Sequence, residues 1–499
     1  MQKGELAMAS DKRSVLVFDF GASSGRAMLC TLENGKISMN EVHRFSNDPV
    51  MVHGTFYWDI LRLFHEIKQG IVKANNAAGF ESIGIDTWGV DFGLIGTGGE
   101  LLENPVNYRD KRTSGILPKV FEMISADELY SATGIEIMEI NTAFQLLAVK
   151  LSESGLLDRT QKMLLMPDLF NYLLTGEMHS ELSIASTTSL LDAESKEWSD
   201  KVINALGLPR NIFADIIQPG EKAGMLTKEL AEELCVPVCP VTAVCGHDTQ
   251  CAAAAVPSEE ENTIFISCGT WSLFGTETDK AVVTPLSAGY NITNETGYGK
   301  KTTFLKNIIG LWFVQETRRF LAKQGQEYSF ADLEKLARES ELFRCFIDPS
   351  APEFVPPGDI PERVREYCRR TGQYVPETLG EVMRCIYESL AMKYRQSLEE
   401  ISECTGLSYD RIYMVGGGIK DTFLCGLAAC ACGCTVSAGP VEATAYGNAA
   451  IQLISLGAVS GIDEARRIIR NSENIRLFAP ENTGEWDKAY EAYKGVLGK

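Results

Sequence analysis

The chain has little that would suit a membrane or a nucleic acid. No apolar run in its 499 residues reaches the ~18 residues that cross a bilayer, and its first ten residues lack the apolar run of a secretory signal. Basic residues number 47 against 67 acidic ones, and this net charge of -20 excludes the basic footprint that nucleic-acid phosphates require. We therefore expect a cytoplasmic protein that acts on small molecules.

Histidines are scarce, and the cysteines follow no disulfide framework. The 14 cysteines have no regular spacing, and a chain of this length does not need disulfides to fold. The segment Ala429-Cys-Ala-Cys-Gly-Cys434 alternates cysteine with small residues. Zinc knuckles usually have the wider Cys-x2-Cys spacing, and the five histidines lie far away in the sequence. We therefore expect reduced thiols that serve as small buried packing residues.

A glycine turn between two apolar strands is the most informative feature that is present. The turn Asp19-Phe-Gly-Ala-Ser-Ser-Gly-Arg26 predicts a clamp for the β- and γ-phosphates of ATP, built on a hairpin. Gly21 and Gly25 let backbone N–H groups approach an anion. Ser23, Ser24 and Arg26 add donors, and Asp19 can hold Mg²⁺ through water. The turn is not a Walker loop, because it lacks Gly-Lys-Ser/Thr. An ordinary turn between core strands is the alternative.

The pattern along the chain predicts two α/β halves with the same order of strands, turns and helices. Each half opens with a strand, a polar glycine turn and another strand, and alternating helices and strands follow. We predict strands within 14–44, a helix over 58–74 and strands over 83–86 and 90–95. The second half predicts a strand over 263–267, a turn over 269–272, helices over 377–398 and 422–432, and strands over 411–415 and 435–437. We place domains at 12–257 and 258–460, with a helical tail at 461–499.

Four motifs in this order resemble the FGGY carbohydrate kinases. They are the first turn, Gly246-His-Asp-Thr249, Ser267-Cys-Gly-Thr-Trp-Ser-Leu273 and Gly416-Gly-Gly418. The resemblance implies two RNase-H-like (actin-like ATPase) domains of α/β class that flank a central ATP and sugar cleft. Further segments resemble the branch of the family that phosphorylates L-rhamnulose. They are Gly84-Ile-Asp-Thr-Trp-Gly-Val-Asp-Phe92, Tyr108-Arg-Asp-Lys-Arg-Thr113, Leu165-Met-Pro-Asp168, Asn291-Ile-Thr-Asn-Glu295, Leu305-Lys-Asn-Ile-Ile-Gly-Leu-Trp312 and Ala438-Gly-Pro-Val-Glu-Ala443.

The resemblance also implies a role for each motif residue. Asp248 would be the general base; the plainer alternative, which is compatible with that role, is that it caps a helix over 249–255. The implied ATP-binding residues are Ala22, Ser23, Ser24, Gly25, Arg26, Thr270, Gln315 and Gly417. The implied substrate-binding residues are Gly89, His247, Asp248, Thr249 and Asn307, and Asp19 is the implied Mg²⁺-side acid.

Several of these positions have plainer alternatives. Thr270 could be a simple turn threonine and Gln315 a solvated helix residue. Trp88 and Trp271 favour core packing, and the loop with Arg109 and Arg112 could be solvated.

The expected reaction is phosphorylation of the C1 hydroxyl of L-rhamnulose by ATP with Mg²⁺. Another ketose, L-fuculose or D-xylulose, remains an alternative, as does a non-catalytic nucleotide switch of the actin or Hsp70 kind. A dinucleotide-binding fingerprint fails, because its third glycine position is Asp421. Members of the same branch often carry Asn there, so the acid puts nucleotide contacts in doubt. A monomer or a homodimer is expected.

Overall fold

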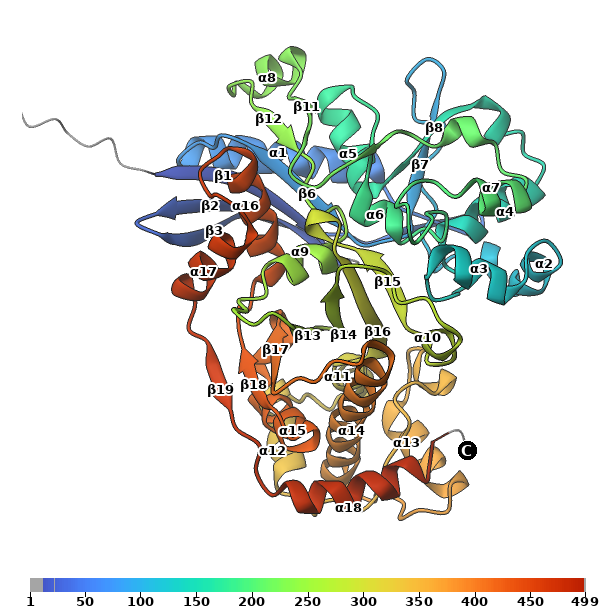
Figure 1. Cartoon of the computed structure of the whole chain (residues 1–499), viewed down its shortest axis with the longest axis vertical. Helices are drawn as coiled ribbons and strands as arrows, with labels where there is room; N and C mark the ends of the chain where they lie inside the picture. The colour runs from blue at the N-terminus through green and yellow to red at the C-terminus, as the bar shows by residue number, and fades with distance from the viewer. Residues whose placement is uncertain (1–11, 22, 498–499) are drawn as a thin grey trace, which may run out of the picture.

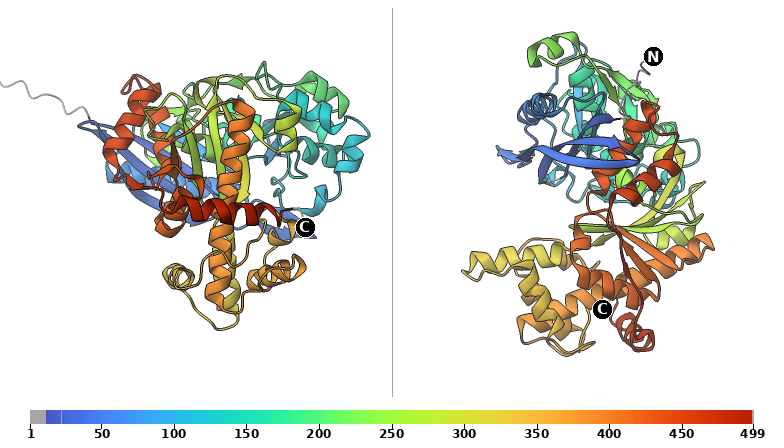
Figure 2. Two further views of the ribbon diagram at one scale, coloured as in Figure 1. Left: turned by 60° about the horizontal axis from the view of Figure 1, so that its bottom comes forward. Right: turned by 90° about the vertical axis from the view of Figure 1, so that its left-hand side faces the viewer.

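Two β-sheets, one from each half of the chain, frame the molecule (Figure 1). The computed structural model describes residues 12–21 and 23–497. Figure 2 shows the two lobes from the side, with the chain crossing between them near residues 440–480. Within the described ranges, no helix combines the length and the apolar character that crossing a bilayer requires.

The first sheet follows the predicted hairpins. Its strands lie in the order β11-β12-β6-β1-β2-β3. β1 pairs antiparallel with β2 and parallel with β6, and nearly all of its residues are buried because helices cover both faces. The strands are β1 (Arg13–Phe20), β2 (Ser24–Glu33), β3 (Lys36–Ser46), β6 (Ile83–Thr87), β11 (Lys222–Met225) and β12 (Pro240–Thr242).

The other elements of the first lobe surround this sheet. Three short strand pairs are β4 (Val50–Val52) with β5 (Thr55–Tyr57), β7 (Phe92–Gly96) with β8 (Thr160–Leu165), and β9 (Ser180–Glu181) with β10 (Ile216–Ile217). The helices are α1 (Ile60–Ala77), α2 (Leu117–Phe121), α3 (Ala126–Thr133), α4 (Thr142–Leu151), α5 (Met166–Thr175), α6 (Leu182–Ser186), α7 (Asp200–Ala205), α8 (Lys228–Leu234) and α9 (Asp248–Ala254).

The second sheet has seven strands in the order β15-β16-β14-β13-β17-β18-β19. It opens with an antiparallel hairpin and continues into parallel strands, as the first sheet does. The strands are β13 (Ile264–Cys268), β14 (Trp271–Thr278), β15 (Thr293–Thr296), β16 (Thr302–Ile309), β17 (Arg411–Val415), β18 (Thr435–Ala438) and β19 (Arg476–Phe478). The later helices are α10 (Pro285–Gly289), α11 (Trp312–Lys323), α12 (Phe330–Arg338), α13 (Ile360–Arg370), α14 (Leu379–Thr405), α15 (Thr422–Cys432), α16 (Ala443–Ser455), α17 (Ile462–Ser472) and α18 (Thr483–Lys494).

The boundaries differ from the prediction where capping or strain intervenes. The first helix starts at Ile60 rather than residue 58, because the Asp59 side chain accepts from the Arg62 N–H and caps it. The long helix of the second half extends to Thr405 and ends only where Gly406 takes a left-handed conformation. The strand predicted over 90–95 starts at Phe92, because Val90 has a positive φ of 66°.

The segment predicted as a helical tail holds helices α17 and α18 and, between them, a short strand. It contains β19, which pairs antiparallel with β18 and extends the second sheet. α17 packs against β3 of the first lobe, and the Ile37 N–H donates to Ser472 Oγ at 2.8 Å. The strand has only three residues, too few to leave an alternating pattern in the sequence.

Helices α9 and α16 join the lobes. α16 packs on β1 and β6 of the first sheet and on α9. One core cluster combines residues of both sheets and of these helices, among them Val17, Ala252, Phe265 and Ala449. Because α9 lies between the sheets, the residues at its start face the junction of the lobes (Figure 1).

Candidate active site

Asp248 lies at the first turn of α9, where the two lobes meet. Its Oδ1 accepts from the Thr249 N–H at 2.7 Å, and its side chain keeps 33% exposure. His247, not Asp248, occupies the N-cap position, so the predicted cap lies one residue too late in the chain. Burial and the nearby Asp19 charge raise the pKa of Asp248 to about 6, while His247 lowers it. The carboxylate is therefore ionised near neutral pH, accessible and basic enough to take a proton.

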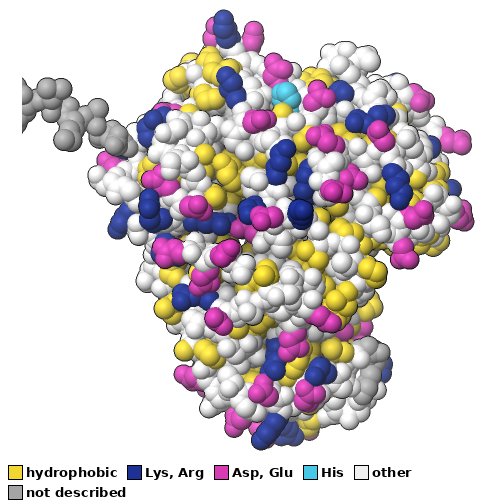
Figure 3. All heavy atoms as spheres, viewed as in Figure 1, with side chains coloured by type: hydrophobic (Ala, Val, Ile, Leu, Met, Phe, Trp, Pro, Cys, Tyr) yellow, Lys and Arg dark blue, Asp and Glu magenta, His cyan; other side chains and the backbone are white. Residues whose placement is uncertain are grey.

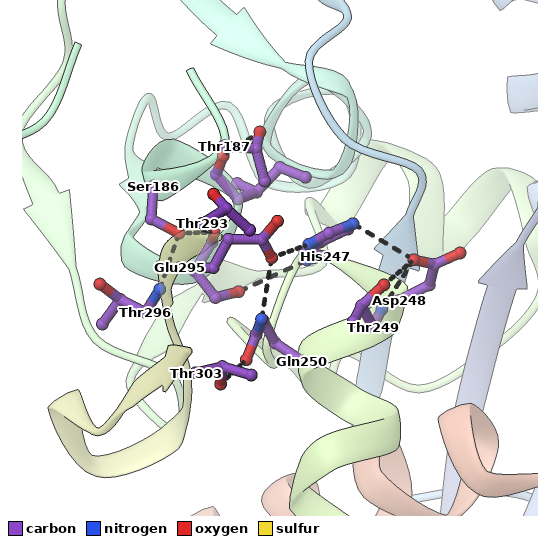
Figure 4. A network of polar contacts seen from close by, with 12 residues as sticks. Ser186, Thr187, His247, Asp248, Thr249, Gln250, Thr293, Glu295, Thr296 and Thr303 are labelled. Carbon is purple, nitrogen blue, oxygen red and sulfur yellow. Dashed lines mark hydrogen bonds and ion pairs between the residues drawn. The ribbon is translucent and has the colours of Figure 1, made fainter. Parts of the chain in front are cut away.

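A line of hydrogen bonds fixes His247 beside this carboxylate (Figure 4). His247 Nδ1 lies 2.8 Å from Glu295 Oε2, and its Nε2 lies 3.5 Å from Asp248 Oδ1. Gln250 Nε2 also donates to Glu295, at 2.8 Å, and Thr303 Oγ1 donates to Gln250 at 2.6 Å. The network runs from β15 and β16 of the second lobe to α9 of the first.

Glu295 makes His247 a cation at neutral pH. Burial alone lowers the pKa of His247, but the carboxylates of Glu295, Asp248 and Glu181 outweigh burial and raise it to about 9. In return, His247 holds the pKa of Glu295 below its usual range despite burial. The sequence singled out Glu295 only as part of a family-like segment. Its spacing from His247 gave no signal of this contact, which the fold creates.

Acidic side chains also converge at the ends of β1 and β6. Asp19 and Asp86 are paired in the parallel register of these strands. Burial and the Asp19 charge raise the pKa of Asp86, and Asp248 adds to this effect. Asn448 Nδ2 donates to Asp86 Oδ2 at 2.6 Å, whereas Asp86 Oδ1 is buried and has no hydrogen-bond partner among the described residues. Mutually repelling carboxylates with an unpartnered oxygen fit a divalent cation with oxygen ligands.

Arg26 connects this acidic group to the second lobe. Its guanidinium donates to Asp19 Oδ2 at 2.7 Å from Nη2 and lies 2.5 Å from Glu442 Oε2 through Nη1. Glu442 comes just before α16. The sequence predicted Arg26 as a phosphate donor and missed Glu442 as its partner, because the two residues are far apart in the chain.

The first glycine turn exposes its tip. The Gly21 N–H donates to Ser24 O at 2.9 Å, and Ser23 is exposed to solvent. Ala22 lies outside the described residues. Gly25 was predicted to let backbone N–H groups approach an anion, but the structure gives another reason for a glycine at this position. A Cβ on Gly25 would lie 2.3 Å from the Phe45 ring, so core packing alone already excludes a side chain there.

The second glycine turn closes in the same way. The Gly269 N–H donates to Trp271 O at 2.8 Å, and the exposed Thr270 donates its hydroxyl to Gln315 Oε1 at 3.1 Å. This contact brings together two of the three nucleotide contacts that were predicted in the second half of the chain. The third of them, Gly417, is exposed at the end of β17, and a Cβ there would meet nothing within 4 Å.

The loop with Gly89 is held in a strained conformation. Val90, a β-branched residue, has φ of 66°, which costs free energy unless neighbours enforce it. Its N–H donates to Thr187 Oγ1 at 3.2 Å, and Thr142 Oγ1 donates to its carbonyl at 2.7 Å. A Cβ on Gly89 would lie 3.3 Å from the Thr187 side chain. Such enforced strain is typical of a binding loop.

Asp91 organises the aromatic residues around this loop. It is buried and accepts from Trp58 Nε1 at 2.6 Å, Trp88 Nε1 at 3.0 Å and the Tyr108 N–H at 3.2 Å. Burial raises the pKa of Asp91 to about 6 in spite of these donors. Trp88 is therefore a core residue, while Trp271 is 45% exposed. This confirms the packing alternative for Trp88 alone.

The remaining sugar-side residues already have partners among the described residues. Asn307 Nδ2 donates to Glu136 Oε2 at 2.8 Å. Arg112 Nη2 donates to Gln145 at 2.6 Å, so its head is not in a solvated loop, while Arg109 is exposed and lies over the Tyr108 ring.

Asp421, the departure from the family pattern, has a local role. It caps α15 by accepting from the Leu424 N–H at 3.0 Å, and the Tyr387 hydroxyl donates to it at 2.5 Å. Burial raises the pKa of Asp421. The Asp421 carboxylate therefore caps the helix, a role that an Asn side chain could perform equally well.

Known protein families match both halves of the chain. Residues 14–255 match the N-terminal domain of the FGGY family of carbohydrate kinases, and residues 264–456 match its C-terminal domain. A protein named rhamnulokinase from Bacteroides thetaiotaomicron is 40% identical over 97% of this chain and 100% of its own length. One of that name from Bacillus subtilis is 37% identical, over 93% of this chain and 95% of its own.

Solved structures share the fold. A xylulose kinase from Lactobacillus acidophilus superposes with a TM-score of 0.81 at 16% identity, over 97% of both chains. A glycerol kinase from Plasmodium falciparum with ADP gives 0.77 at 15% identity, over 99% of this chain and 100% of the other. The predicted two-domain α/β fold is confirmed.

Proposed function

The chain belongs to the FGGY family of carbohydrate kinases, and we propose that it transfers the γ-phosphoryl group of ATP to the C1 hydroxyl of L-rhamnulose. The observation that carries the chemistry is Asp248, an accessible carboxylate with a pKa raised to about 6 where the lobes meet. The names of relatives at 37–40% identity over nearly the whole chain support the choice of sugar.

Asp248 takes the proton of the sugar hydroxyl as its oxygen forms the bond to the γ-phosphorus and the bond to ADP breaks. In a loose transition state this proton moves late, so positioning contributes more than basicity. His247 and Thr249 flank the carboxylate, and the cation at His247 keeps it ionised. The strained Gly89–Val90 loop offers backbone groups to the sugar hydroxyls, and Asn307 offers an amide.

The two glycine turns hold the nucleotide. Ser23, Ser24 and the backbone after Gly21 donate to the phosphates from the first lobe, and Thr270 with Gln315 donates from the second. Exposed backbone at Gly417 lets adenosine lie against the end of β17. Mg²⁺ fits beside Asp19 and Asp86, where it would supply positive charge against the phosphate oxygens.

The test of the substrate is an ADP-release assay with L-rhamnulose, L-fuculose and D-xylulose. We expect the highest kcat/KM with L-rhamnulose, and NMR of the product should show phosphorus coupling to C1. A higher kcat/KM for another ketose would replace the sugar but keep the reaction. Nucleotide binding without any sugar-dependent ADP release would favour the nucleotide switch.

The test of the base is Asp248→Asn. The amide cannot take the proton, so kcat should fall by about 10²–10⁴-fold. Binding of ADP, measured by calorimetry, should stay close to wild type because the amide keeps the hydrogen bond from the Thr249 N–H. Near wild-type turnover would show that another group accepts the proton.

A further inference from the structure

Three buried cysteines meet in the second lobe, far from Asp248. Cys345 lies in the segment after α12, Cys368 on α13 and Cys385 on α14. Their Sγ atoms all lie within 4.8 Å of one another, and none of the three is in a disulfide. Figure 1 shows α13 and α14 at the opposite end of the molecule from the first sheet, whereas α9 lies at the junction.

We propose that Cys345, Cys368 and Cys385 form a binding site for one Zn²⁺ ion. Zinc–sulfur bonds of about 2.3 Å in a tetrahedral site place sulfur atoms about 3.8 Å apart. The three thiols therefore need to move by only about 1 Å to reach ligand spacing. Thiolates are soft ligands that favour zinc or monovalent copper over magnesium or calcium.

Zinc coordinates thiolates rather than thiols, so its binding would release the thiol protons of the three cysteines to solvent.

The surroundings favour a divalent ion. The nearby guanidinium of Arg384 is buried and already pairs with Glu388 at 2.6 Å, so it does not neutralise three thiolates. Zn²⁺ would leave one net negative charge on the cluster, whereas monovalent copper would leave two in a nearly dry interior. The fourth ligand is water. A cavity of about 10 Å³ beside Cys345 and Cys385 has room for one molecule.

The backbone around the cluster is fixed before any ion binds. The Ile347 N–H donates to Ser389 Oγ at 2.9 Å, and the Phe343 N–H donates to Glu388 Oε2 at 2.9 Å. These bonds attach the segment that carries Cys345 to α14. A bound ion would cross-link this segment, α13 and α14, and so stabilise the outer part of the second lobe.

The experiment measures metal binding directly on the full-length protein. The protein is purified with reductant, stripped with a chelator and titrated with Zn²⁺ and with Co²⁺. Wild type should bind one Zn²⁺ per chain, and the Co²⁺ form should show thiolate-to-metal charge-transfer absorption. Zinc should raise the thermal unfolding midpoint by a few degrees and protect these three thiols from alkylation, as peptide mapping would show.

Cys368→Ser and Cys385→Ser should lose the bound ion and the rise in Tm. The matched control is Cys425→Ser, a buried cysteine of α15 in the same core cluster, which should behave as wild type. Alkylation protection in wild type tests the site even if a variant fails to fold. The proposal is overturned by wild type that binds no zinc, by equal binding in Cys368→Ser, or by a disulfide within the trio in reduced protein.

Discussion

The two glycine turns have similar backbone hydrogen bonds, but one is surrounded by charged side chains and the other by neutral ones. In each, a buried strand ends, a glycine N–H donates to a carbonyl two or three residues later, and an exposed hydroxyl residue occupies the tip. The first turn is flanked by charges, with Asp19 and Arg26 paired across the hairpin and Glu442 added from the second lobe. The second turn is neutral, with Thr270 bound to Gln315.

This difference assigns a different task to each lobe. Charged groups at the first turn would set the electrostatic field where a metal and the reacting phosphate lie. Because the chain has a net charge of -20, a site that attracts phosphate has to be confined to a small region. Neutral donors at the second turn would position the proposed nucleotide at little electrostatic cost. On the face that Figure 3 shows, basic and acidic side chains are interspersed rather than gathered by sign.

The charged turn should be the more sensitive one. In Asp19→Asn, Arg26 loses a buried partner and the acidic group loses a charge that would hold Mg²⁺. We expect kcat to fall by about 10²–10³-fold, the range for loss of a preorganised electrostatic group. Turnover at saturating ATP, measured across a Mg²⁺ titration, checks this. Unchanged kcat at every Mg²⁺ concentration would remove the distinction between the turns.

The sequence predicted the turns because each is encoded by neighbouring residues. Asp19 to Arg26 and Gly269 to Thr270 carry their own turn chemistry, and the family-like motifs added roles for Asp248 and Gln315. The structure added partners that lie far away in the chain: Glu442 for Arg26 and Glu295 for His247. Such contacts depend on how the two sheets meet, and no local periodicity records that. The strand β19 was missed for a related reason, since pairing with β18 rather than its own pattern defines it.

The glycines of the two turns should also differ in what they tolerate. A Cβ at Gly25 would lie 2.3 Å from the Phe45 ring, whereas a Cβ at Gly269 would lie 3.7 Å from its nearest neighbour, Trp271 O. We expect Gly25→Ala to cost about 1–3 kcal/mol of stability through overpacking. Gly269→Ala should change stability much less. Thermal unfolding of both variants makes the comparison, and equal midpoints would contradict it.

The ion pair between Glu295 and His247 links the two lobes, and Glu295→Gln should narrow the pH range of activity. Without that carboxylate the pKa of His247 falls from about 9, so the imidazole is neutral at lower pH. Asp248 then loses its cation while Asp19 still opposes ionisation, and its pKa rises above about 6. With Asp248 as the proposed base, activity requires its ionised form, so the acidic limb of kcat/KM moves to higher pH. A rise of one unit costs about tenfold in activity on the acidic side.

The control for this variant is Glu277→Gln. Glu277 is a partly buried carboxylate of the same sheet and pairs with Arg466 at 2.6 Å. Its loss should lower stability and leave the pH limits in place. If both variants lose activity equally at every pH, Glu295 acts on stability alone.

The smallest effect is expected at the neutral turn. Thr270→Ala removes one hydroxyl, and a single neutral hydrogen bond contributes about 0.5–1.5 kcal/mol. The KM for ATP should therefore rise by about 2–12-fold, while the KM for the sugar and the acidic limb of the pH profile stay unchanged. Steady-state kinetics with each substrate varied in turn provide the measurement.

Thr270→Ser separates the hydroxyl from the methyl group. The serine keeps a donor within reach of Gln315 and of a phosphate oxygen, so its KM for ATP should return close to wild type. Because Thr270 is exposed, neither variant should alter stability measurably. A loss of kcat in Thr270→Ala as large as that of Asp19→Asn would mean that the hydroxyl also stabilises developing charge, and that the second turn is as electrostatic as the first.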